Sequence, residues 1–208
     1  LKNQTEIGQL TAQINPHFLY NTLEIIRNLV VFDPGRADSL IIQLTQILRY
    51  SIDTSREYVH LDEDMAYIED YLDIQKCRCG ERLQYEIDIA DDCYPCMIPK
   101  LVLQPIIENS IKYGFQKKEQ IHIHIEGRKN GSLLCLSVKD DGLGMRQAEA
   151  ERLLGSLHSP NPGAEHIGLH NIARRLFLQY GSDSGLELHN EEGVGLEVIV
   201  KIRQKGED

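Results

Sequence analysis

The chain has 208 residues, of which 41% are hydrophobic and 26% are charged, and a formal net charge of −10. This length and composition predict one or two soluble domains with an aliphatic core, since there is no Trp and only 6% of the residues are aromatic. The acidic net charge argues against nucleic acid as a main partner, because phosphate binding needs clustered Lys and Arg. No apolar run in the sequence is long enough to cross a bilayer.

Residues 1–56 contain two helical patterns separated by a turn. The first pattern has apolar residues at spacings of three, four or seven: Ile7, Leu10, Ile14, Phe18, Ile25 and Leu29. The stretch FDPGR at 32–36 supplies turn residues, and the apolar spacing then resumes at Leu40, Ile41, Leu44, Ile47, Leu48 and Ile52. This predicts an antiparallel helical hairpin. A hairpin alone cannot bury both of its apolar faces, so we expect a dimeric four-helix bundle.

Pro16 and His17 fall inside the first helical pattern. Proline has no backbone N–H to donate, so the carbonyl of Ala12 would lose its helical partner. We therefore expect the helix to bend at Pro16 and to expose His17. A lone histidine in a helix is most often a surface or core residue without chemistry, and position alone does not overturn that interpretation.

The segment 57–80 predicts a helix that connects the hairpin to a third domain at 81–208. Its apolar positions are Leu61, Met65, Ile68, Leu72 and Ile74. Its acidic residues are Asp62, Glu63, Asp64, Glu69, Asp70 and Asp73. We expect them to form a solvated face of the helix, and a metal-binding cluster is the alternative.

Four of the five cysteines are paired in sequence, as Cys77-x-Cys79 and Cys93-x-x-Cys96. Together they would supply the ligands of a four-cysteine zinc site. No histidine supports this set, and Cys135 stands alone in a predicted strand. Reduced, unpaired thiols are the favoured interpretation.

Residues 81–208 alternate between strand and helix patterns. We expect strands at 83–89, 121–127, 132–140, 184–190 and 195–203, and helices at 100–114 and 171–181. Gly114 and Gly181 are the expected ends of the two helices. This order favours a mixed sheet with helices on one face, so the chain as a whole is α+β, a helical hairpin followed by a two-layer α/β sandwich.

Two features of the third domain indicate a ligand-binding site, although each alone has a plain alternative. In DDGLG, a buried carboxylate at Asp140 would accept a hydrogen bond from an exocyclic amine such as that of adenine, and the glycines would let the backbone come close to a ligand. The alternative is an ordinary strand followed by a glycine turn. In IIENSIKYG, the amide oxygen of Asn109 suits Mg²⁺ and Lys112 suits phosphate, while Glu108 and its neighbours would otherwise mark an exposed helix edge.

The third feature is HIGLHNIARRL. Gly168 precedes a predicted helix whose first N–H groups would face a phosphate, and Arg174 and Arg175 follow in the same helix. The alternative is an ordinary junction between a loop and a helix, with both arginines in solvent.

In this order the three features resemble the ATP-binding domain of histidine kinases, shared in outline with gyrase, a heat-shock chaperone and the mismatch-repair protein MutL. The family's boxes correspond to Glu108–Asn109 with Gly114, Asp140–Gly142–Gly144, a lid loop over Arg146–Glu165, and Gly168–Leu169. Upstream, QINPHFLYNTLE resembles the phosphoacceptor segment of LytS/YesM-type sensor histidine kinases, and LRYSI, YLDIQKCRCGERL, IPKLVLQPIIENSIKYG and GVGLEVIVKI extend the match. The resemblance covers nearly the whole chain and implies the Bergerat (GHKL) ATP-binding fold.

The resemblance also implies residue roles. His17 would be the phosphoacceptor, Asn109 the Mg²⁺ ligand and Asp140 the carboxylate that specifies adenine. The other nucleotide contacts would be Lys112, Tyr113, Gly142, Gly144, Gly168 and Leu169. With ATP and Mg²⁺, the γ-phosphoryl group would pass to His17 and then to an aspartate of a response regulator.

Several positions depart from the family pattern. Phe18 stands where many kinases have an acid after the histidine, so Glu24, Asn21 or Glu108 would have to assist, and the sequence does not choose among them. His166 replaces a glycine of the second box, Asp141 replaces Asn and would add a charge beside the nucleotide, and Leu196 replaces Thr.

The implied protein is a homodimeric histidine kinase whose partner is a response regulator, commonly a DNA-binding regulator of the AraC type in the YesM branch. Because the first residue is Leu1 rather than Met, we expect the cytoplasmic piece of a membrane-anchored bacterial sensor, with any membrane segment upstream. A GHKL-type ATPase or ATP-gated switch without histidine phosphorylation is the alternative, and a nonenzymatic dimerisation module with a decayed pocket is the third hypothesis.

Overall fold

The computed structural model describes residues 15–116, 118–157 and 167–204. The expected apolar positions Ile7, Leu10 and Ile14 lie outside these ranges. The chain divides into two compact units, one formed by Leu1–Glu57 with Glu63–Glu81 and the other by Tyr58–Asp62 with Arg82–Asp208. Within the described ranges, no helix is long and apolar enough to span a membrane.

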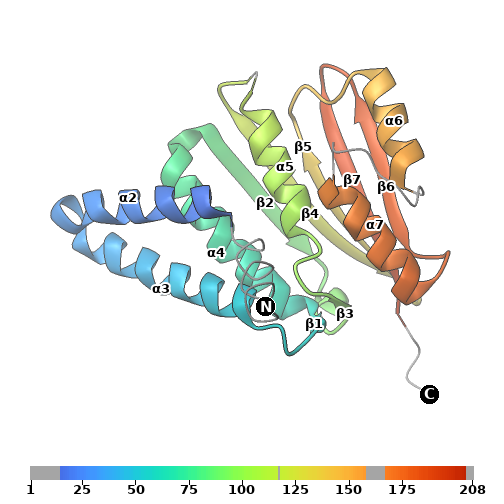
Figure 1. Ribbon diagram of the computed structural model, residues 1–208, viewed down its shortest axis with the longest axis horizontal. Helices are drawn as coiled ribbons and strands as arrows, with labels where there is room; N and C mark the ends of the chain where they lie inside the picture. The colour runs from blue at the N-terminus through green and yellow to red at the C-terminus, as the bar shows by residue number, and fades with distance from the viewer. Residues whose placement is uncertain (1–14, 117, 158–166, 205–208) are drawn as a thin grey trace, which may run out of the picture. The chain divides into compact units, whose positions relative to one another are not determined.

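The first unit contains the predicted helical hairpin, with α2 at Pro16–Phe32 and α3 at Pro34–Ile52 (Figure 1). Only Asp33 separates the two helices. Its backbone N–H donates to the carbonyl of Leu29 at 2.7 Å, and its carboxylate accepts from the backbone N–H of Arg36 at 3.0 Å. Asp33 therefore ends one helix and caps the next, and Pro34 follows at a position where a helix tolerates its missing N–H.

Pro16 begins α2 and does not interrupt it. The side chain of Asn15 caps the helix by accepting from the backbone N–H of His17 at 3.1 Å, and the N–H of Leu19 donates to the carbonyl of Asn15 at 3.2 Å. At the first helical position the missing N–H of proline has no intrahelical partner to lose. The predicted bend involves Ala12, which lies outside the described residues, so it stays a prediction, whereas the predicted exposure of His17 is confirmed.

Helix α4, Leu61–Cys79, belongs to the first unit from Glu63 onward. The rings of Phe18 and Tyr71 lie 5.0 Å apart, and Arg36 pairs with Asp73 at 3.0 Å. The expected solvated acidic face is wrong at Asp64, which has no exposed surface and accepts a hydrogen bond from the hydroxyl of Tyr50 at 2.7 Å. Its place in an acidic run predicted that Asp64 would be exposed, but the packing of the first unit buries it.

The second unit contains a five-stranded sheet in the order β2-β4-β5-β7-β6, in which β2 and β4 are parallel and the other neighbours antiparallel. The strands are β2 Leu83–Ile89, β4 Ile121–Asn130, β5 Leu133–Asp140, β6 Gly185–Glu191 and β7 Gly195–Arg203. Two short strands that the sequence did not predict, β1 Tyr58–His60 and β3 Met97–Pro99, form a separate pair.

Three helices cover one face of the sheet: α5 Gln104–Gly114, α6 Gln147–Leu157 and α7 Ile167–Tyr180 (Figure 1). Alternate residues of β4, Ile121, Ile123 and Ile125, are completely buried, as a half-buried strand requires. The predicted two-layer architecture is confirmed.

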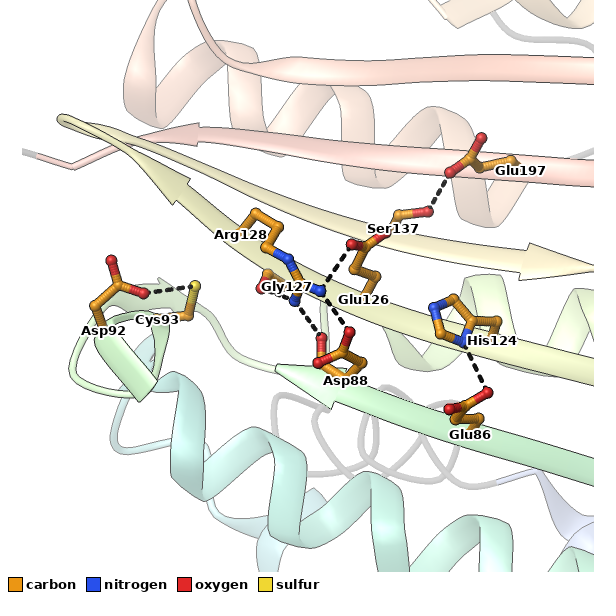
Figure 2. A network of polar contacts seen from close by, with 10 residues as sticks. All are labelled: Glu86, Asp88, Asp92, Cys93, His124, Glu126, Gly127, Arg128, Ser137 and Glu197. Atoms are coloured by element: carbon orange, nitrogen blue, oxygen red, sulfur yellow. Dashed lines mark hydrogen bonds and ion pairs between the residues drawn. The ribbon is translucent and has the colours of Figure 1, made fainter. Parts of the chain in front are cut away.

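The other face of the sheet carries polar side chains that pair across strands and, for Arg128 and Glu126, within β4 (Figure 2). Arg128 reaches both Asp88 and Glu126, His124 lies 3.5 Å from Glu86, and Ser137 donates to Glu197 at 2.6 Å. Opposite charges on neighbouring strands stabilise such a face without burying it.

Several helix boundaries differ from the prediction. Helix α5 begins at Gln104 and not at Lys100, because Leu101 has φ of 60°, a left-handed conformation that a right-handed helix excludes. Helix α7 begins at Ile167, so Gly168 lies in its first turn. The expected lid loop contains α6, and the rest of that segment lies outside the described residues.

Candidate functional site

Asp140 ends the central strand β5 and is only 7% exposed. One carboxylate oxygen accepts from the hydroxyl of Ser110 at 2.8 Å, and the other accepts from the backbone N–H of Gly142 at 3.0 Å. Burial raises the pKa of this carboxyl group, and these hydrogen bonds partly offset the effect. Asp140 is thus a carboxylate held in a fixed orientation inside the fold.

Asp140 opens onto a cavity between the sheet and the helices. Six residues that the sequence singled out line this cavity: Asn109, Tyr113, Asp140, Gly142, Gly144 and Leu169. Helix α5, the loop after β5 and the start of α7 bring them together from positions far apart in the chain. A concave cavity with a few convergent polar groups is the usual form of a small-molecule site.

The cavity also has lining residues that the sequence analysis missed as site residues. They include Ser110, Met145 and Glu149. Ser110 follows Asn109 directly, and its place beside the polar pair Glu108–Asn109 was the available signal. Met145 carried no signal, because its place on the cavity wall depends on how the loop after β5 folds.

Three of the predicted site residues in the second unit are not part of the cavity wall. Lys112 is exposed, with its ammonium 5.0 Å from the centre of the Tyr113 ring. Gly168 lies against Pro105, since a Cβ on it would come within 3.4 Å of the Cβ of Pro105. Glu108 is half-buried and accepts from the side chain of Gln104 at 2.8 Å; burial raises its pKa, which this bond partly offsets.

Gly144 adopts φ of 62°, a left-handed conformation that favours glycine. A Cβ at this position would also lie 2.6 Å from the carbonyl oxygen of Glu191. The loop after β5 therefore passes close to the hairpin between β6 and β7, which only a glycine allows.

The side chain of Asp141 does not line the cavity, although its charge acts on Asp140 and contributes to raising the pKa of that carboxyl group. The carboxylate of Asp141 accepts from the backbone N–H of His122 at 2.8 Å, and its own N–H donates to the carbonyl of His122 at 3.1 Å. It lines a different hollow, together with His122, Lys139 and His189. Leu196 contributes an apolar side chain to the cavity of Asp140, and His166 lies outside the described residues.

His17 lies exposed in the first turn of α2. It borders an open groove within the first unit whose other lining residues are Asn21, Glu24, Ile25, Asn28 and Arg78. The amide nitrogen of Asn21 lies 3.2 and 3.3 Å from the two ring nitrogens of His17. Phe18, next in sequence, points the other way and is buried against Tyr71.

In the part of the chain that the structure describes, no three His, Cys, Asp or Glu side chains are placed to hold a metal ion. Cys93 and Cys96 are buried in the second unit, whereas Cys77 and Cys79 belong to the first. The side-chain amide of Asn109 on the cavity wall is the oxygen donor that fits a nucleotide-bound Mg²⁺, which takes most of its ligands from phosphate and water.

Comparison with known proteins decides the family. The family model described as histidine kinase-, DNA gyrase B- and HSP90-like ATPase matches residues 98–206. The chain belongs to this family. A second family model, described as histidine kinase, matches residues 5–83, which include His17. The resemblance expected from the sequence is confirmed in both parts of the chain.

Named relatives support the same conclusion. The chain is 37% identical over 206 residues to the sensor histidine kinase YesM of Bacillus subtilis (strain 168), which is 98% of this chain and 34% of that protein. It is 32% identical over 197 residues to the sensor protein kinase HptS of Staphylococcus aureus (strain USA300), which is 95% of this chain and 38% of that protein. The chain thus spans about a third of the length of these sensor kinases.

Solved structures share the fold at lower identity. The catalytic domain of the histidine kinase ThkA matches with a TM-score of 0.56 at 16% identity, covering 72% of this chain and 97% of that domain. The histidine kinase domain of the blue-light activated histidine kinase EL346 of Erythrobacter litoralis matches with a TM-score of 0.51 at 16% identity, covering 95% of this chain and 93% of that one. The expected histidine kinase fold is confirmed.

Proposed function

We propose that this chain is the kinase region of a two-component sensor, which binds Mg-ATP in the cavity at Asp140 and transfers the γ-phosphoryl group to His17. The observation that carries the proposal is the buried, hydrogen-bonded carboxylate of Asp140 on the wall of a cavity lined by five further residues of the expected ATP site. A carboxylate has about four acceptor positions, so Asp140 keeps acceptor capacity for an exocyclic amine beside its bonds to Ser110 and to backbone N–H groups.

The other residues of this site suit the rest of the nucleotide. The apolar side chains of Leu169 and Leu196 offer surface to the adenine ring, and the amide of Asn109 offers an oxygen to Mg²⁺. Lys112, exposed beside Tyr113, is free to reach the phosphates. When bound, Mg²⁺ would neutralise charge on the transferred phosphoryl group.

His17 has the properties of a phosphoryl acceptor. Its ring is exposed, and the side-chain amide of Asn21, 3.2 and 3.3 Å from the two ring nitrogens, can orient the ring so that one nitrogen faces the γ-phosphoryl group. That nitrogen forms the new P–N bond as the bond between the γ-phosphorus and ADP breaks, and the proton on the ring leaves to a base. Glu24 and Glu108 are carboxylates able to accept it, whereas an amide such as Asn21 can only orient the ring.

The hairpin supports the proposal of a homodimer. Large apolar side chains stay exposed on its two helices in the single chain: Tyr20, Leu23, Val30, Val31, Phe32, Ile41, Ile42 and Ile52. A second copy that buries them would complete a four-helix bundle. The phosphoryl group would then pass to an aspartate of a response regulator. From the family resemblance we propose that this partner is a DNA-binding regulator of the AraC type. The resemblance also supports a cytoplasmic position for this chain within a membrane-anchored sensor.

The test is incubation with γ-labelled ATP and Mg²⁺. We expect acid-labile, base-stable label that is lost in His17→Ala, while ATP binding is unchanged. His189→Ala is the matched control, because His189 is also exposed but pairs with Glu197 in the second unit. Absence of label in a chain that binds ATP would contradict the proposal. ATP hydrolysis that continues unchanged in His17→Ala would favour the alternative, an ATPase or ATP-gated switch.

A further inference from the structure

The loop that follows β5 forms one wall of the nucleotide cavity through Gly142, Leu143, Gly144 and Met145. On its other side this loop rests on the hairpin between β6 and β7. The backbone N–H of Gly193, at the tip of that hairpin, donates to the carbonyl of Leu143 at 2.7 Å. The wall of the cavity therefore has a support from a segment about 50 residues later in the sequence.

The strongest part of this support is the side chain of Asn190 in β6. Its oxygen accepts from the backbone N–H of Met145 at 2.7 Å, and its nitrogen donates to the backbone carbonyl of the same residue at 2.9 Å. Both polar groups of one peptide residue are thus satisfied by one side chain, as a neighbouring strand would satisfy them. Asn190 is half-buried and reaches the loop without lining the nucleotide cavity itself.

Only a side-chain amide can make this pair of bonds. A carboxylate of the same shape accepts from the N–H but repels the carbonyl, and a hydroxyl is too short to reach both atoms. The close approach of Gly144 to the carbonyl of Glu191 shows that loop and hairpin are in contact along several residues. Without Asn190 the loop would keep its glycine contact but lose two hydrogen bonds that set the position of Met145.

We propose that Asn190 is a positioning residue for the adenine nucleotide, acting through Met145 to hold the loop after β5 in its binding conformation. The inference rests on the proposed function, since it assigns Asn190 a role in that same site. A loop that already has the bound conformation loses little conformational entropy when the nucleotide binds. Holding the loop in this conformation therefore increases the affinity for the nucleotide. The step of phosphoryl transfer involves none of these atoms, so the rate at saturating ATP should change little.

The experiment compares Asn190→Ala and Asn190→Asp with the unaltered chain. The matched control is Asn130→Asp, the same chemical change at an exposed asparagine at the far end of β4, roughly 20 Å along the strand from the residue paired with Asp140. The dissociation constant for ATP, the labelling rate at saturating ATP, and hydrogen exchange of residues 141–146 without nucleotide are measured. We expect ATP binding about 5- to 30-fold weaker, a saturated rate within about threefold, and faster exchange of the loop in the Asn190 variants only.

The outcomes separate the inference from the proposed function. If the unaltered chain binds no adenine nucleotide, the proposed function is wrong. The role proposed for Asn190 is then wrong as well, because it depends on that function. If the unaltered chain binds ATP and Asn190→Asp binds it equally well with unchanged loop exchange, only the inference is wrong. A variant that is less stable but binds ATP normally once folded would show a merely structural role and would also overturn the inference.

Discussion

Replacing Asp140 by Asn tests the nucleotide site most directly. Asn has the same shape, and its side-chain oxygen can still accept from the backbone N–H of Gly142, while its amide nitrogen can donate to the hydroxyl of Ser110. The fold around the residue should therefore survive. What changes is the charge and the acceptor capacity offered to the cavity.

The expected loss follows from the type of hydrogen bond removed. A bond to an ionised acceptor contributes about 1.5–3 kcal/mol, so ATP should bind about 10- to 150-fold more weakly to Asp140→Asn. Asp141→Asn is the matched control, because the neighbouring carboxylate binds the N–H of His122 and does not line the cavity. It should leave the affinity within about twofold.

The same variant should change how stability depends on pH. Burial raises the pKa of the Asp140 carboxyl above its ordinary 3.8, so the folded chain keeps this proton at a pH where the unfolded chain has lost it. A rise in pH through that window therefore removes stability from the unaltered protein. Asn does not titrate, so the free energy of unfolding of Asp140→Asn should fall less steeply above pH 4 than that of the unaltered chain.

Isothermal titration with ATP and urea unfolding at a series of pH values measure the two effects. Equal ATP affinity in Asp140→Asn and the unaltered chain would refute the role of this carboxylate in recognising adenine. Parallel pH profiles in the two proteins would refute the conclusion that burial disfavours its ionised form.

Three further outcomes are expected. Gly195→Ala should destabilise the second unit by about 1–3 kcal/mol in urea unfolding and weaken ATP binding, because Gly195 has φ of 155° and its Cβ would meet the carbonyl oxygen of Asp140 at 2.0 Å. Tyr50→Phe should lower the unfolding free energy of the first unit by about 1–3 kcal/mol with ATP affinity unchanged, since the buried carboxylate of Asp64 loses the hydroxyl donor. Pro16→Ala should leave the labelling rate of His17 within about twofold, because a first-turn proline does not bend its helix; a large change would contradict that position.

Local patterns in the sequence predicted most of the second unit. Alternating apolar residues located the strands β2, β4, β5, β6 and β7, and a glycine with φ of 81°, Gly181, ends the last helix where the sequence predicted it. These features depend on neighbours within one or two turns of chain, so a single sequence contains them. The resemblance of the ordered motifs then predicted six of the cavity residues before their distances were known.

The errors share a different physical origin. Asp64 belongs to an acidic run, but its burial depends on the hydroxyl of Tyr50 in another helix. Asp141 follows Asp140 directly, but the register of β5 against β4 turns it toward His122. Periodicity describes one element at a time and carries no information about which element packs against it.

By itself, the sequence determined the five strands of the main sheet, the hairpin turn at Asp33 and six of the residues that line the cavity. The tertiary structure alone decided that Asn190 supports Met145, 45 residues earlier in the chain. A contact of that kind depends on strand order and register, which are set by the packing of the whole sheet and have no local signature. The helix start at Pro16 likewise needed the observed cap by Asn15, because the same residues fit a continuous helix equally well.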